Sequence, residues 1–182
     1  MRVEGVLFSP QIILTADGWM DPLPYEEEVL LYAQCSTHAS TTRHEFQPVH
    51  VLKRSPKEGW ALLQSDAPIS CAQQSSLPSL NVSELYEGQQ LLSMEPPPKR
   101  MTSLLVSGRG TGVLAYFQLV TGSLSIGSPL FDTQGKFVTL SAGFTRSTLD
   151  SLIGPHWTPV LPKEAIEHAL REAKLLIRSH RQ

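Results

Sequence analysis

Two serines flank an isoleucine and a glycine in the segment TGSLSIGSPLFDTQGKF, which runs from Thr121 to Phe137. A serine hydroxyl is a weak nucleophile until an imidazole takes its proton, and that imidazole needs an acid to hold its tautomer. Ser125 could act as such a nucleophile only if a base were brought to it. The histidines that could serve as its base are His38, His44 and His50.

The elements that would position such groups are short. Most of the chain consists of brief apolar stretches separated by Pro, Gly, Ser and Asp, a spacing typical of strands and turns. The predicted strands are Gly5–Phe8, Gln11–Ala16, Glu28–Gln34, His50–Lys53, Trp60–Gln64, Gln89–Met94, Ser103–Ser107, Gly112–Leu119, Pro129–Phe131 and Lys136–Phe144. Only the C-terminal end has helical periodicity, beginning at Pro162, with apolar residues at Ile166, Ala169, Leu170, Ala173, Leu176 and Ile177. The sequence predicts an all-β fold closed by one α-helix.

Composition limits the possible partners. The 182 residues suffice for one domain or for two small lobes. Apolar residues make up 41% and the formal net charge is −2, so no general attraction to nucleic acid or to anionic membranes is expected. No apolar run approaches the ~18 residues that a membrane-spanning helix needs, and the first residues do not resemble a signal peptide. With only Cys35 and Cys71, a soluble intracellular protein with reduced thiols is expected.

No cofactor or metal site is predicted. The glycine-rich segment Gly108–Gly112 resembles a nucleotide loop, but a phosphate cradle needs a helix after it and the residues that follow are typical of a strand. A tight hairpin turn is the preferred interpretation. The three histidines do not have the spacing of a zinc site, and no pair of carboxylates accompanies them.

Several motifs occur in the order found in one enzyme family. GVLFSPQIILTADGW, from Gly5 to Trp19, resembles the strand and turn that end in Thr-Ala-Ala-His and present a catalytic base. GWALLQ, from Gly59 to Gln64, resembles the Asp-x-Ala-Leu-Leu strand of a catalytic acid. IGSPLFDTQGKFVTL, which begins at Ile126, is similar to Ser-Gly-Gly-Pro-Leu followed by a hydrophobic residue and a later glycine. Together with LYEGQQLLSM, GVLAYFQL and HWTPVLPKEAIEHAL, these motifs resemble the trypsin/chymotrypsin-like serine proteases of the HtrA type over nearly the whole chain.

The resemblance implies two packed antiparallel β-barrels with a C-terminal helix. The first barrel would span approximately residues 1–75, the second 76–160 and the helix 161–182, all within one trypsin-like domain. The resemblance also implies that the three catalytic positions, here Gly18, Gly59 and Ile126, converge at the cleft between the barrels.

None of these three residues can do the family's chemistry. Glycine offers no imidazole or carboxylate at positions 18 and 59, and Ile126 has no lone pair. Leu124 stands where the family has the glycine that shapes the oxyanion hole. We therefore predict a catalytically inactive pseudoprotease that acts as a protein-binding or structural subunit of a larger assembly. The alternatives are a serine hydrolase with a rearranged active site around Ser125, and a regulatory decoy that binds protease substrates.

The N-terminal edge is the predicted binding site. In the family, a further strand precedes the segment that begins here at Val3, so the first barrel would present an unpaired edge to a partner strand. The candidate residues are Val3, Glu4, Gly5, Val6, Leu7 and Phe8. HtrA-type chains also have upstream residues that join trimers and a downstream PDZ domain. Because we find neither the trimer-joining residues nor a PDZ domain in the sequence, a homotrimer is not expected. Protein partners are expected to bind at the N-terminal edge instead.

Overall fold

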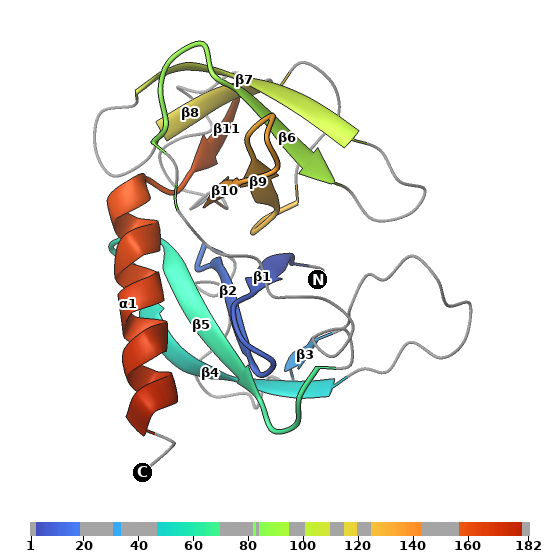
Figure 1. The fold of residues 1–182 in the computed structure, drawn as a ribbon, viewed down its shortest axis with the longest axis vertical. Helices are drawn as coiled ribbons and strands as arrows, with labels where there is room; N and C mark the ends of the chain where they lie inside the picture. Colours follow the sequence, from blue (N-terminus) through green and yellow to red (C-terminus); the bar gives the residue numbers. More distant parts are fainter. Residues whose placement is uncertain are drawn as a thin grey trace, which may run out of the picture.

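A computed structural model describes residues 3–18, 31–33, 47–69, 82, 84–94, 101–109, 115–119, 125–142 and 157–179. These residues form two antiparallel sheets and one C-terminal helix. Figure 1 shows the two sheets one above the other along the long axis of the molecule, with the helix beside the lower sheet. The expected class, mostly β with a single closing helix, is confirmed.

The first sheet has five described strands in the order β1-β2-β5-β4-β3. Ser9 closes the hairpin between β1 and β2, where its carbonyl accepts from the N–H of Ile12, and a turn ending at Gly59 joins β4 to β5. Register shifts between Val51 and Lys53 mark an irregularity in β4. The strands are β1 (Gly5–Leu7), β2 (Ile12–Ala16), β3 (Leu31–Ala33), β4 (Gln47–Ser55) and β5 (Trp60–Ser65).

The second sheet has six described strands in the order β10-β9-β6-β7-β8-β11. Its two outer strands meet at their ends, where Ser141 forms a β-bridge with Val160 and the N–H of Leu161 donates to the carbonyl of Leu140 at 3.1 Å. The sheet therefore curves back toward itself. The strands are β6 (Gln90–Met94), β7 (Met101–Arg109), β8 (Ala115–Leu119), β9 (Pro129–Phe131), β10 (Phe137–Leu140) and β11 (Trp157–Val160).

The glycine-rich segment Gly108–Gly112 lies where β7 is joined to β8. Arg109 pairs with Ala115 in an antiparallel ladder, so the segment connects two strands and no helix follows it. Gly108 and Arg109 belong to β7 itself, whereas residues 110–114 lie outside the described part of the chain. The preference for a hairpin over a phosphate-binding loop is confirmed.

The helix α1 (Lys163–Ser179) follows Pro162, which suits a first helical turn because it has no N–H to leave unpaired. One face of α1 is buried at Ala165, Ile166, Ala169, Leu170 and Ala173. This face shares a hydrophobic core with Leu14 and Leu62 of the first sheet and with Phe137 and Leu140 of the second. The helix is thus a structural link between the two sheets. No described helix is long and apolar enough to cross a membrane.

Candidate functional site

The loop at the predicted nucleophile position is a tight turn before β9. The N–H of Ser128 donates to the carbonyl of Ser125 at 3.1 Å, and the N–H of Gly127 donates to the carbonyl of Ser141 at 2.9 Å. The carbonyl of Ile126 accepts from the N–H of Glu4 at 2.8 Å. The loop of the second sheet is therefore hydrogen-bonded to the segment that leads into β1.

Gly127 is the closest point of this contact. Its φ is +79°, in the left-handed region that favours glycine. A Cβ at this position would lie 2.0 Å from the carbonyl oxygen of Glu4 and 2.7 Å from Oγ1 of Thr15. Thr15 in turn donates its hydroxyl to the same Glu4 carbonyl at 2.6 Å. A glycine is required here for packing, whether or not its neighbour is a nucleophile.

The side chain of Ile126 packs into an apolar cluster of the first sheet. The buried members of that cluster are Val49, Ala61 and Leu63, and the partly buried Val3, Ile13 and Ile126 pack against them. Ile126, at the predicted nucleophile position, therefore contributes an apolar contact between the two halves of the molecule.

Gly18 and Gly59, at the other two predicted catalytic positions, lie beside each other. The N–H of Asp17, which precedes Gly18, donates to the carbonyl of Gly59 at 2.8 Å. Gly59 has a φ of +78°, and a Cβ there would lie 2.9 Å from Cδ2 of the fully buried Leu161. Ile126 packs against the cluster that contains Ala61, two residues beyond Gly59. The convergence of all three catalytic positions at one point stays a prediction.

Asp17 is 2% exposed and directly precedes Gly18, the residue at the predicted catalytic-histidine position. Arg54 of β4 donates to both of its carboxylate oxygens, from Nε at 2.6 Å and from Nη2 at 3.0 Å. A two-bond pairing of this kind neutralises the buried charge and fixes the carboxylate plane. Asp17 is therefore a structural acid.

The described serines near Ile126 have no imidazole partner. The carbonyl of Ser125 accepts from the hydroxyl of Ser141, and the hydroxyl of Ser128 donates to Oε2 of Glu4 at 2.6 Å. His50 lies on β4, where Nδ1 is 3.7 Å from the exposed Asp66. His38 and His44, like Cys35 and Cys71, lie outside the described residues. Nothing in the described geometry activates Ser125.

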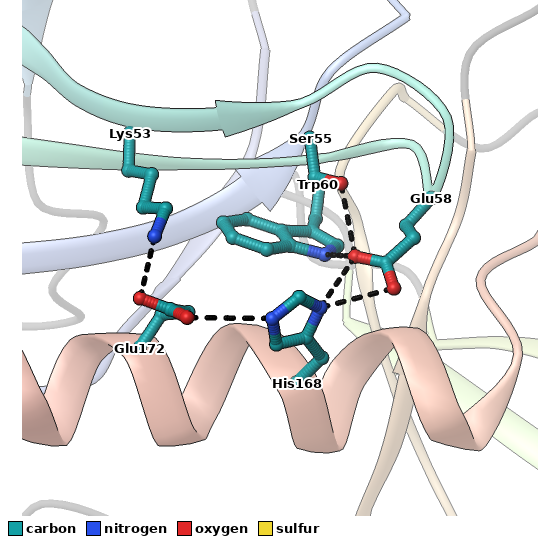
Figure 2. Close-up of polar contacts among 6 residues, drawn as sticks. All are labelled: Lys53, Ser55, Glu58, Trp60, His168 and Glu172. Carbon is teal, nitrogen blue, oxygen red and sulfur yellow. Dashed lines mark hydrogen bonds and ion pairs between the residues drawn. The ribbon is translucent and has the colours of Figure 1, made fainter.

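A polar cluster that the sequence did not predict lies between the β4–β5 hairpin and α1 (Figure 2). Glu58, the neighbour of Gly59, accepts from Nε1 of Trp60 at 2.7 Å and from the Ser55 hydroxyl at 2.9 Å. Its carboxylate also lies 2.7 Å from Nδ1 of His168 on α1. The ring of the fully buried Trp60 meets that imidazole edge-on, with the centroids 5.5 Å apart. We call this group, with Lys53 and Glu172, the helix-docking cluster.

The far side of His168 also meets a carboxylate. Its Nε2 lies 3.4 Å from Oε1 of Glu172, whose Oε2 accepts from Lys53 of β4 at 2.6 Å. Partial burial raises the pKa of Glu58, but hydrogen bonds from Trp60, Ser55 and His168 outweigh it and lower the pKa overall. The hydrogen bond from Lys53 lowers the pKa of Glu172, against partial burial.

An imidazole paired with a carboxylate suggests general-base chemistry, but here the second ring nitrogen faces another carboxylate instead of a hydroxyl. Among the described residues no group of three or more His, Cys, Asp or Glu side chains could hold a metal ion. The contacts of the cluster join α1 to β4 and to the β4–β5 hairpin. The one local signal for it was the spacing of His168 and Glu172, which are four residues apart on one helical face.

The predicted binding edge coincides with the outer strand of the first sheet. β1 pairs with β2 through Gly5 opposite Thr15, Val6 opposite Leu14 and Leu7 opposite Ile13. Within the described residues β1 has no second neighbouring strand. Ahead of it, Glu4 turns toward Ile126, as described above.

No protein-family model matches the sequence, and no curated protein is close enough in sequence to count as a relative. Among solved structures, the chain is similar to the protease domain of MamO from Magnetospirillum magneticum, determined in its apo form. The TM-score is 0.67 at 18% sequence identity, and the match covers 92% of this chain and 87% of that one. At this identity the likeness shows the fold alone, and the two antiparallel sheets with their closing helix have the trypsin-like, HtrA-like fold.

Proposed function

We propose that this chain is a catalytically inactive member of the trypsin-like fold that works by binding protein, as a subunit of a larger assembly. The observation that carries the proposal is that an isoleucine, Ile126, stands at the predicted nucleophile position. Ile126 has no group that can attack a carbonyl, and its side chain packs with Ala61 and Leu63 of the first sheet. An acyl transfer needs a nucleophile, a base and an orienting acid in mutual contact.

The surroundings of the other two positions support the same reading. Gly18 and Gly59 supply neither base nor acid, and the acid next to Gly18 is already paired with Arg54. The hairpin acid Glu58 is committed to His168 on α1. Meanwhile the residues that frame a trypsin-like site, among them Thr15, Ala16, Ala61 and Leu130, are buried and maintain the fold. The scaffold is kept while its chemistry is lost, which favours a role in binding.

A fluorophosphonate probe tests the inactive state directly, because it labels a serine only when a base activates the hydroxyl. We expect no labelling of the purified chain under conditions in which trypsin is labelled fully. The Ser125→Ala variant is the matched control. Labelling that disappears in this variant would establish a rearranged active site and overturn the proposal.

We place the binding site at the outer edge of β1. The N–H of Phe8 donates to the carbonyl of Ile12, so residues 8 and 12 form a hydrogen-bonded pair of the antiparallel hairpin. Such pairs alternate, so Val6 also bonds to β2, while the N–H and C=O groups of Gly5 and Leu7 point away from it. A row of this kind is a template for an added strand. The second sheet, with six strands and meeting ends, offers no comparable gap among its described strands.

Amide hydrogen exchange tests the edge residue by residue. In the isolated chain we expect the amides of Gly5 and Leu7 to exchange quickly and the amide of Val6, the control within the same strand, to be protected. In a complex with a partner, Gly5 and Leu7 should become protected. Full protection of both amides in the isolated monomer would mean that the chain covers its own edge, and this binding mode would then be wrong.

A further inference from the structure

The solvent side of α1 has an uneven charge distribution. Arg171, Lys174 and Arg178 are all exposed, and Leu175 among them is 58% exposed. Residues three and four positions apart are neighbours on a helix, so these four side chains form one continuous surface. We call it the cationic stripe.

Two carboxylates of α1 near the stripe pair with other cations, and the third, Glu164, lies in the first turn of the helix, seven residues before Arg171. Lys163 lies 3.4 Å from Glu84 and 3.8 Å from Glu167, and Glu172 accepts from Lys53 at 2.6 Å. No described carboxylate forms an ion pair with the stripe cations. This local excess of positive charge occurs in a chain whose formal net charge is −2.

The helix dipole explains only part of the pattern. Cations are favoured within the last turn, which accounts for Arg178 at the C-terminal end of α1. Arg171 lies about two turns before that end, where the dipole no longer acts appreciably. The dipole also gives no reason for a largely exposed leucine in the middle of three cations.

We propose that the cationic stripe binds an acidic segment of a partner protein, whose carboxylates pair with Arg171, Lys174 and Arg178 and whose apolar side chain covers Leu175. Guanidinium and ammonium groups complement carboxylates in charge and in hydrogen bonding, and the central leucine suits an apolar anchor ringed by polar contacts. This inference rests on the proposed function only in taking the partner to be a protein.

The geometry favours protein over the other polyanions that a basic helix could bind. A membrane-surface helix buries a broad apolar face in the lipid, but the apolar face of α1 is already buried against the two sheets. Phosphate contacts with nucleic acid would make use of the three cations and leave Leu175 without a partner. An acidic peptide with one apolar side chain uses all four residues.

The test measures binding of the full chain to a short fluorescent peptide that has glutamates at every third or fourth position and one leucine. The stripe variant is Arg171→Gln with Lys174→Gln. The control is Lys57→Gln with Lys136→Gln, which removes the same charge from two exposed hairpin turns. We expect about tenfold weaker binding for the stripe variant, within twofold of wild type for the control, and weaker binding at high salt. Leu175→Ser should also weaken binding at constant charge.

Other outcomes overturn the inference. These are no detectable peptide binding, equal losses in the stripe and control variants, or tighter stripe-dependent binding to phosphatidylserine vesicles or duplex DNA than to the peptide. Self-association that the stripe variant abolishes would assign the surface to a second copy of the chain and would likewise overturn it. The fluorophosphonate experiment is independent of these residues, so failure of this inference and failure of the proposed function can be told apart.

Discussion

Arg54 holds Asp17 through two hydrogen bonds, at 2.6 and 3.0 Å, and Asp17 directly precedes Gly18, the residue predicted to stand at the catalytic-histidine position. The pair links the end of β2 to β4 across residues that are 37 apart in sequence. Because Asp17 is buried, Arg54 compensates its carboxylate inside the fold.

Removing the partner should therefore be costly. We expect Arg54→Met to lower the free energy of unfolding by about 2–4 kcal/mol, because it leaves a buried carboxylate unpaired. The double variant Arg54→Met with Asp17→Asn should recover part of the loss. Urea denaturation of both variants measures the effect, and equal stability of Arg54→Met and wild type would show that the pair has no structural role.

A substitution at Gly127 tests the close approach of the two halves. Gly127→Ala combines a left-handed φ with a Cβ placed 2.0 Å from the Glu4 carbonyl, so the loop or β1 must move. Gly135 has nearly the same φ, +77°, with nothing within 4 Å of the added Cβ. We expect Gly135→Ala to cost about 1 kcal/mol and Gly127→Ala at least twice that. Thermal and urea unfolding of the two variants give the comparison.

Gly59, the predicted acid position, should not tolerate an aspartate. Gly59→Asp introduces a side chain at a φ of +78° and brings its Cβ against the buried Leu161. Gly88→Asp is the matched control, with a φ of +82° and open space around it. Destabilisation of Gly59→Asp should exceed that of the control by about 1–2 kcal/mol, the scale of a tight core contact. Equal midpoints in urea would mean that the position can accept an acid.

Docking of α1 should contribute strongly to stability. Ile166 is fully buried in the core shared by the two sheets, so Ile166→Ala should lower the free energy of unfolding by about 2–5 kcal/mol. Leu175→Ala, on the exposed side of the same helix, should stay within about 0.5 kcal/mol of wild type. Deletion of residues 165–182 should cost several kcal/mol. An unchanged melting temperature after that deletion would rule out docking.

The helix-docking cluster predicts a specific acid sensitivity. The pKa of both Glu58 and Glu172 is lowered in the folded state relative to the value of 4.5 for an unperturbed glutamate. Both therefore contribute stability that is present above pH 4.5 and is lost as the pH falls through their folded-state pKa. The variant Glu58→Gln with Glu172→Gln should show a shallower loss of unfolding free energy in this acid range. Parallel curves for variant and wild type would contradict this.

The amino-acid sequence by itself determined the local elements and the chemistry that three particular residues cannot do. Short apolar runs in Ile12–Ala16 and Trp60–Ser65, each too short for a helix and bounded by turn residues, predict strands that are buried on both faces. Pro162 and the apolar spacing after it predict the helix. The inability of Gly18, Gly59 and Ile126 to act as base, acid and nucleophile follows from side-chain identity.

The tertiary structure alone decided which of these elements meet. His168 and Glu58 are 110 residues apart, and Ser128 and Glu4 are 124 apart, so no local pattern could pair them. The reason that Gly127 must be a glycine is likewise the distant Glu4 carbonyl. Periodicity reports which face of an element is buried, but not what covers that face. What covers each face depends on how the two sheets and α1 pack together. The packing also brings polar groups from distant segments into contact, and once buried these groups need hydrogen-bond partners.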